Sequence, residues 1–152
     1  MGRLDRFLFG LHVFIGAGAM LGGLAAVLDP SSPLGMPADS LKRSPFKDFL
    51  IPGLILLVVL GLGNLASAAV FLMKKRWRGY YSLVAGGILM VWIIVQCLML
   101  QTVAFPHVLF FALGAIQSSF AMLALYQECL FPAPILDVVF PGLAKRIGAR
   151  FQ

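Results

Sequence analysis

The chain has 152 residues, of which 61% are hydrophobic and 12% are charged, so it carries too few charged side chains to cover a soluble domain of this size. It has 12 Lys and Arg residues against 6 Asp and Glu residues, which gives a net charge of +6. The cations lie between long apolar runs, a pattern typical of membrane topology signals. We therefore predict a membrane protein and no nucleic-acid partner.

Four apolar runs dominate the sequence. Residues 7–28, 52–73, 80–100 and 106–126 contain no Asp, Glu, Lys or Arg. A helix needs roughly 20 apolar residues to cross a hydrocarbon core about 30 Å thick. Because backbone amides in lipid must be bonded internally, each run is predicted to be a transmembrane helix. The predicted fold class is all-α, an integral membrane four-helix bundle that occupies residues 1–152 as a single membrane domain.

The loop after the first predicted span, residues 29–51, is expected to cover the outer end of the bundle. Its proline-rich beginning predicts irregular turns. Ser44 followed by Pro45 is typical of a helix N-terminus, and the apolar residues up to Ile51 predict a short interfacial helix. Pro52 and Gly53 then predict a bend where the chain enters the second span.

Two basic segments border the later spans. Lys74, Lys75, Arg76 and Arg78 surround Trp77, a mixture that predicts contact with anionic lipid head groups. The tail, residues 129–152, has apolar residues every four positions with cations opposite them, which predicts an amphipathic helix on the membrane surface. The apolar positions are Leu143, Ile147 and Phe151, and the cations are Lys145, Arg146 and Arg150.

The distribution of cations predicts the orientation in the membrane. The N-terminus, the loop after the second span and the tail share one side and hold nine of the 12 Lys and Arg residues. Short loops rich in positive residues stay in the cytoplasm. We therefore expect a multi-pass protein of the cell membrane with both termini cytoplasmic.

The uncharged polar residues inside the spans fall into two predicted layers. Counting about 1.5 Å per residue from the span ends places one group in the cytoplasmic half and the other near the outer edge. Such residues either bond neighbouring helices or form a functional site, and the inner group is the preferred candidate site. The inner group comprises His12, Asn64, Ser67 and Gln117, and the outer group comprises Gln96, Gln101 and His107.

Small residues within the spans predict close helix packing. Gly18 and Gly22 lie four positions apart in the first run, and Gly63 lies in the second. Small residues at this spacing let two backbones approach in lipid. We expect the contacts to lie within one copy of the chain, while a homo-oligomer or a partner membrane protein remains the alternative.

The sequence offers no constellation for a cofactor, a metal or catalysis. His12 and His107 are predicted near opposite membrane faces, so they could not share a haem. Cys97 and Cys129 are separated in the same way, which excludes a disulfide between them. The apolar runs contain no carboxylate for proton-coupled transport or metal binding. We expect a non-enzymatic protein without a cofactor or a metal.

Three segments carry a resemblance: SPFKDFLIPGLIL at 44–56, GLGNL at 61–65 and VWIIVQ at 91–96. This pattern resembles a family of small, uncharacterised bacterial four-helix integral membrane proteins. The resemblance implies the same architecture in a bacterial inner membrane and implies no activity.

Three functional hypotheses follow, in order of preference. The first is an accessory or assembly subunit, or a binder of lipid or another apolar ligand. The second is a small oligomeric channel or transporter whose polar path is lined by His12, Asn64 and Gln117. The third is a membrane enzyme that acts on a lipid-soluble substrate.

Overall fold

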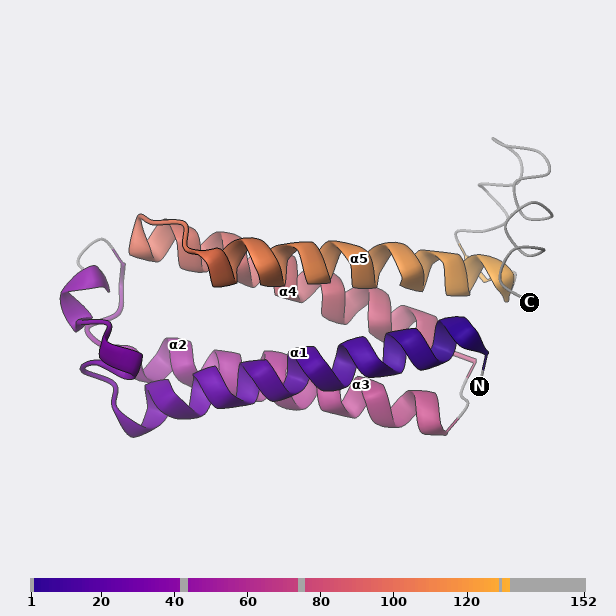
Figure 1. The fold of residues 1–152 in the computed structure, drawn as a ribbon, viewed down its shortest axis with the longest axis horizontal. Coiled ribbons are helices and arrows are strands. Elements are labelled where there is room, and N and C mark those ends of the chain that lie inside the picture. Colours follow the sequence, from indigo (N-terminus) through magenta and orange to yellow (C-terminus); the bar gives the residue numbers. More distant parts are fainter. Residues whose placement is uncertain (1, 42–43, 74–75, 129, 132–152) are drawn as a thin grey trace.

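The computed structural model describes residues 2–41, 44–73, 76–128 and 130–131, and over these ranges the chain consists of helices joined by short irregular connections. Four helical segments are each long and apolar enough to cross a membrane, which confirms the predicted all-α four-helix fold (Figure 1). The segments are α1 (Arg3–Leu28), a second span made of α2 (Leu50–Ile55), η3 (Leu56–Leu62) and α3 (Gly63–Leu72), then α4 (Arg78–Leu100) and α5 (Phe105–Gln127).

The four segments form two helical hairpins. The broadest contacts join α1 to the second span and α4 to α5, as Figure 1 shows. The hairpins meet along narrower contacts, between α1 and α5 and between α3 and α4. The helices therefore pack more closely within each hairpin than between the two hairpins. Open space between side chains is expected where the hairpins meet.

Glycine residues allow the helices within each hairpin to approach closely. A Cβ atom on Gly23 of α1 would lie 2.6 Å from the backbone nitrogen of Leu57 in η3. A Cβ atom on Gly86 of α4 would lie 2.9 Å from the backbone oxygen of Gly114 in α5. At both positions a larger residue would collide with backbone, so both hairpins depend on glycine.

The glycines predicted from the sequence make a different set of contacts. Gly18 faces the ring of Phe110, and Gly22 faces the side chain of Leu56. Gly63 has no heavy atom within 4 Å of the position that a Cβ atom would take. The expected helix contact at Gly63 is therefore corrected: this glycine lies beside open space.

The second span contains a π-helical stretch, Leu56–Leu62, between its two α-helical parts. π-Helical turns inside α-helices are rare and often lie at functional sites. Here the stretch ends directly before Gly63 and Asn64. The local change of helical pitch thus coincides with the open space beside Gly63.

The loop between α1 and α2 covers one end of the bundle. It contains the short helices η1 (Pro33–Gly35) and η2 (Ala38–Leu41). Leu41 and Phe49 are buried against Ala26 of α1 and Met99 of α4, with Phe46 packed beside them. The expectation that this loop caps the bundle agrees with these contacts.

The predicted helix at residues 44–51 and the predicted bend at Pro52 are wrong. Residues 44–49 form bends, in which the Phe46 amide donates to Ser44 Oγ at 3.2 Å. Helix α2 begins at Leu50, so Pro52 lies in its first turn, where the amide hydrogen that proline lacks has no helical partner. The second span therefore continues through Pro52 from Leu50 to Leu72.

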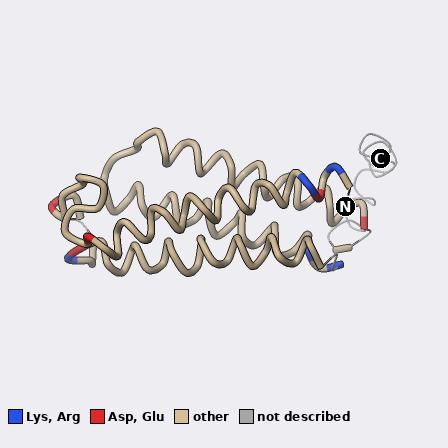
Figure 2. The backbone as a smooth tube through the Cα atoms, turned by 60° about the horizontal axis from the view of Figure 1, so that its bottom comes forward, with Lys and Arg blue, Asp and Glu red and all other residues tan. Residues whose placement is uncertain are grey.

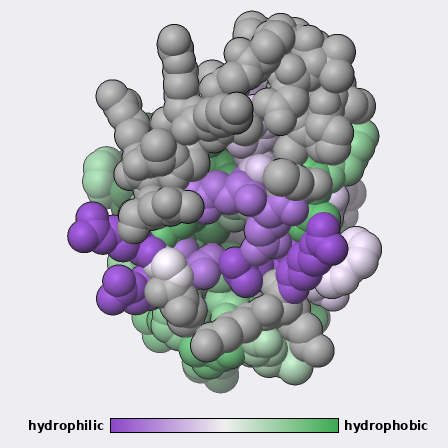
Figure 3. All heavy atoms as spheres, turned by 90° about the vertical axis from the view of Figure 1, so that its right-hand side faces the viewer, coloured by the Kyte–Doolittle hydropathy of each residue, from purple (hydrophilic) through white to green (hydrophobic). Residues whose placement is uncertain are grey.

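Charged residues lie at the two ends of the bundle, and the long middle section contains none among the described residues (Figure 2). The beginning of α1 and the end of α5 share one end, which we call the basic end. Figure 3 views this end and shows hydrophilic residues across its centre and hydrophobic residues along its margins. The predicted amphipathic helix, together with Lys74 and Lys75, lies outside the described residues.

Candidate functional site

Four polar side chains, one from each span, meet inside the bundle. His12 of α1, Asn64 of α3, Ser82 of α4 and Gln117 of α5 are each at most 1% exposed. His12 Nδ1 lies 2.9 Å from Asn64 Oδ1, and His12 Nε2 lies 3.0 Å from Ser82 Oγ. We call these four residues the polar cluster. It joins all four spans by side chains that lipid cannot hydrogen-bond.

The hydrogen bonds determine the tautomer of His12. Asn64 Nδ2 donates to the backbone oxygen of Leu60 at 2.8 Å, which leaves Asn64 Oδ1 as the atom that faces the imidazole. Because Oδ1 can only accept, His12 Nδ1 must carry the hydrogen. For a neutral imidazole, Nε2 then accepts a hydrogen bond from the hydroxyl of Ser82.

Gln117 completes the polar cluster from α5. Its Nε2 donates to the backbone oxygen of Ser82 at 3.2 Å and lies 3.4 Å from Asn64 Oδ1. Its Oε1 is buried and has no hydrogen-bond partner among the described residues. A buried acceptor without a partner costs about 1–3 kcal/mol. The cluster therefore has one acceptor that a further donor could satisfy.

The order Ser82, His12, Asn64 is the order of a nucleophile, a base and the group that orients the base. Catalysis also requires that a substrate reach the nucleophile, and Ser82 has 0% exposure. Among the residues described, no three His, Cys, Asp or Glu side chains gather as a metal site would require. The geometry is that of a buried hydrogen-bond network that joins four helices.

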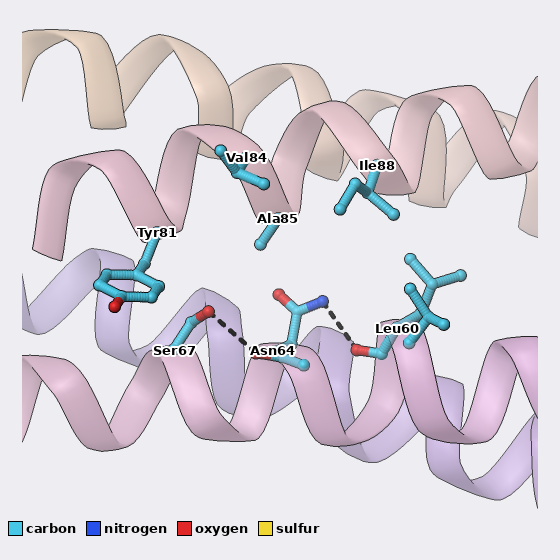
Figure 4. A pocket seen from close by; sticks show the side chains of 9 residues that line it. Leu60, Asn64, Ser67, Tyr81, Val84, Ala85 and Ile88 are labelled. Atoms are coloured by element: carbon cyan, nitrogen blue, oxygen red, sulfur yellow. Dashed lines mark hydrogen bonds between the residues drawn. The ribbon is translucent and has the colours of Figure 1, made fainter.

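A groove lies next to the polar cluster, between the second span and α4 (Figure 4). Its cavity volume is about 160 Å³. We call it the lateral groove, because Val59, Val84 and Ile88 on its walls are 42–59% exposed and would face lipid. The other lining residues are Leu60, Gly63, Asn64, Ser67, Tyr81 and Ala85.

Asn64 belongs to both features. Its carboxamide takes part in the polar cluster, and its side chain also forms part of the wall of the lateral groove (Figure 4). Gly63 contributes open space because it has no side chain. The groove is thus mainly apolar with a small number of polar groups, the composition that is usual for sites that bind small molecules.

The inner polar group predicted from the sequence is brought together in part. His12, Asn64 and Gln117 meet, whereas Ser67 donates to the backbone oxygen of Gly63 at 2.9 Å and lines the groove. Ser82 takes the fourth place in the cluster and was missed by sequence reasoning. The sequence did contain a signal for Ser82, since it is one of the few polar residues of its span. Counting residues from the span ends missed it, because that count assumes that all the helices are parallel and begin at the same depth.

The outer polar group lies toward the end of the bundle opposite the basic end, where α4 ends and α5 begins. His107 Nδ1 accepts a hydrogen bond from the Ala104 amide at 3.0 Å, so His107 caps the first turn of α5. Gln101 adopts a left-handed conformation with φ of 50° and ends α4, where its side chain donates to the backbone oxygen of Leu98 at 2.6 Å. Gln96 is half-buried on α4. His107 and Gln101 therefore serve the helix ends on either side of a short connection.

The predicted lipid-binding cations have separate roles at the basic end. Arg78 pairs with Asp5 at 3.0 Å and with Glu128 at 2.6 Å, and so connects the beginnings of α1 and α4 to the end of α5. Burial raises the pKa of the Glu128 carboxyl above its ordinary value, and the attraction of Arg78 opposes this shift. Arg76 is exposed, so of these two arginines it is the one available to a ligand in the membrane interface.

The fold and the polar cluster define the class of protein: a multi-pass membrane protein with four spans and a hydrogen-bonded polar centre. No protein-family model, curated protein or solved structure matches the chain. A fold alone does not determine a function, so the function has to follow from the chemistry of the cluster and the groove.

Proposed function

We propose that this protein is a non-enzymatic membrane protein that binds an apolar ligand of the lipid class in the lateral groove between the second span and α4. The observation that carries the proposal is the groove itself, about 160 Å³ in volume, open on the lipid-facing surface and lined mainly by aliphatic side chains. A lipid-soluble ligand would reach it directly from the bilayer.

The burial of the polar cluster supports binding over transport. A polar path requires polar groups that are exposed to a continuous water-filled space. Here the imidazole of His12, the Oδ1 of Asn64 and the Nε2 of Gln117 bond within the cluster, and all of its side chains are buried. Flux of an ion or a metabolite through proteoliposomes that is abolished by Asn64→Leu would contradict the proposal.

The location in the cell is part of the proposal. The resemblance of the segments at 44–56, 61–65 and 91–96 supports a bacterial inner membrane, and the excess of Lys and Arg at the basic end supports cytoplasmic termini. A reporter that is active only outside the cytoplasm, fused after Gln152, should be inactive. Activity of that fusion would contradict the orientation.

The groove is tested by filling it. Gly63 lines the groove beside open space, so Gly63→Leu should occupy the groove without disturbing backbone contacts. Gly10 also lies in a span beside open space and does not line the groove, which makes Gly10→Leu the matched control. Mass spectrometry of the purified protein should show a retained apolar ligand in the wild type and in Gly10→Leu, and its loss in Gly63→Leu.

The proposal fails if the two variants retain the same ligands in the same amounts.

A serine-directed fluorophosphonate probe tests the enzyme hypothesis. Because Ser82 is fully buried, we expect no more labelling of the wild type than of Ser82→Ala. Labelling that depends on both Ser82 and His12 would show that the hydrogen-bond network is catalytic.

A further inference from the structure

The lateral groove changes in polarity along its length. Tyr81 and Ser67 line the part of the groove nearest the basic end, and Ile88 lies about 10 Å further along α4, at about 1.5 Å per residue (Figure 4). Asn64 lies between these two ends. An occupant would therefore have its polar part near Tyr81 and its apolar part toward Ile88.

The connection between α3 and α4 joins the two walls of the groove at the basic end, and it carries the cation Arg76 and the aromatic ring of Trp77. Trp77 is 64% exposed and Tyr81 is 53% exposed. Exposed Trp and Tyr side chains at the end of a span lie at the level of the lipid head groups. Tyr81 thus places the polar end of the groove at the depth where a phospholipid has its ester groups.

The two described arginines of this connection differ in what they can bind. Arg78 is occupied by Asp5 and Glu128. Arg76 is exposed, and its attraction lowers the pKa of Glu128 less than the attraction of Arg78 does. Arg76 is therefore an accessible positive charge in the connection between the two helices that form the groove, and it complements an anionic head group.

We propose that the ligand of the lateral groove is an anionic phospholipid. Its phosphate pairs with Arg76, the hydroxyl groups of Tyr81 and Ser67 face its ester region, and one acyl chain lies between the second span and α4. The aliphatic wall of the chain-binding part is formed by Val59, Leu60, Val84, Ala85 and Ile88. This inference rests on the proposed function, because it names the ligand of the same groove.

The test is a lipid competition read by native mass spectrometry. The full-length protein is placed in nanodiscs that contain equal amounts of phosphatidylglycerol and phosphatidylcholine with identical acyl chains, then released, and the lipids that stay bound are counted. The wild type should prefer phosphatidylglycerol by about fivefold, the effect expected of one interfacial cation. Arg76→Gln should reduce this preference to about onefold.

Arg6→Gln is the matched control, because Arg6 is exposed at the same end on α1, and α1 does not line the groove. It should keep the preference for phosphatidylglycerol. Inorganic phosphate at millimolar concentration should not displace the bound lipid, because the acyl chain contributes to binding. Displacement by phosphate would show an anion site without a lipid site and would overturn the inference.

The remaining outcomes separate this inference from the proposed function. If phosphatidylglycerol and phosphatidylcholine are retained equally but Gly63→Leu still removes bound lipid, the groove binds apolar ligands and the anionic class is wrong. If Gly63→Leu changes no lipid retention, the proposed function fails as well. If the wild type is a dimer that Gly63→Leu converts to a monomer, a second copy of the chain occupies the groove, and both statements are overturned.

Discussion

Glycine lies in two helix contacts of the bundle, the one between α4 and α5 and the one between α3 and α4. The backbones approach closely in the first contact and remain apart in the second. Gly86 and Gly114 bring the backbones of α4 and α5 together, whereas Gly63 of α3 lies beside open space across from α4. A glycine in a span permits close approach, but the neighbouring helix must also present its backbone at the same level. The close α4–α5 contact stabilises the bundle, whereas the wider α3–α4 contact forms the lateral groove.

The largest expected difference comes from making the same substitution, glycine to leucine, in each of the two contacts. Gly86→Leu should destabilise the protein by about 1–3 kcal/mol or more, because its Cβ atom would lie 2.9 Å from the Gly114 oxygen and 3.1 Å from the Ser118 nitrogen. Gly63→Leu should leave stability unchanged or raise it by up to about 1 kcal/mol, since leucine is the better helix former. Unfolding in mixed micelles with increasing SDS measures both. Equal losses would show that the α3–α4 contact is closed too.

The second comparison sets the polar cluster against the groove wall. His12→Leu should cost about 1–3 kcal/mol, because it leaves Asn64 Oδ1 and the Ser82 hydroxyl buried without their partner. Ser67→Ala should cost less than about 0.6 kcal/mol, because Ser67 bonds only the backbone of its own helix. The same SDS titration compares them. A larger loss for Ser67→Ala would place the stabilising network in the groove.

A smaller effect is expected at the basic end, where a cation joins three helix ends. Arg78→Gln should destabilise the protein by about 1 kcal/mol, because Asp5 and Glu128 lose the positive charge between them. Arg76→Gln should have no measurable effect on unfolding, since Arg76 is exposed. This pair separates stability from lipid binding. An equal loss in both variants would contradict the division of roles between the two arginines.

The smallest effect is a pH dependence at Glu128. Its pKa is raised in the folded state, so its contribution to stability is fully present below about pH 4.5 and is lost as the pH rises through the folded pKa. Glu128→Gln should remove this dependence and stabilise the protein at neutral pH by no more than about 0.5 kcal/mol, because water screens a partly exposed group. Unfolding measured from pH 4 to pH 8 tests it. If Glu128→Gln is instead less stable than the wild type at neutral pH, the attraction of Arg78 for Glu128 outweighs the effect of burial.

Sequence reasoning predicted the spans more accurately than the contacts between them. The absence of charge from the four apolar runs was enough to predict four helices, because lipid admits no other structure for such runs. The packing role of Gly63 and the bend at Pro52 were mispredicted. Gly63 was mispredicted because open space lies beside it, which the sequence does not reveal. Pro52 was mispredicted because α2 starts at Leu50, which places the proline in the first turn.

The sequence predicted that uncharged polar residues would meet inside the bundle, but it identified only some of the residues that do. His12, Asn64 and Gln117 were expected together because counting along the spans places them in the same half of the membrane, where polar side chains bond neighbouring helices. Ser82 was missed and Ser67 was included, because depth counted along each helix does not show which face that helix turns toward its neighbours. A period of 3.6 residues is invisible where nearly every face is apolar.

The amino-acid sequence by itself determined that this protein is a four-span helical membrane protein, because the cost of burying charges and unpaired backbone groups in lipid leaves no alternative for its apolar runs. The tertiary structure alone decided which glycines touch backbone, which serine completes the polar cluster, and which arginine is engaged in ion pairs. It also decided where the groove lies. These features depend on the relative rotation and height of helices, which packing sets after each helix has formed.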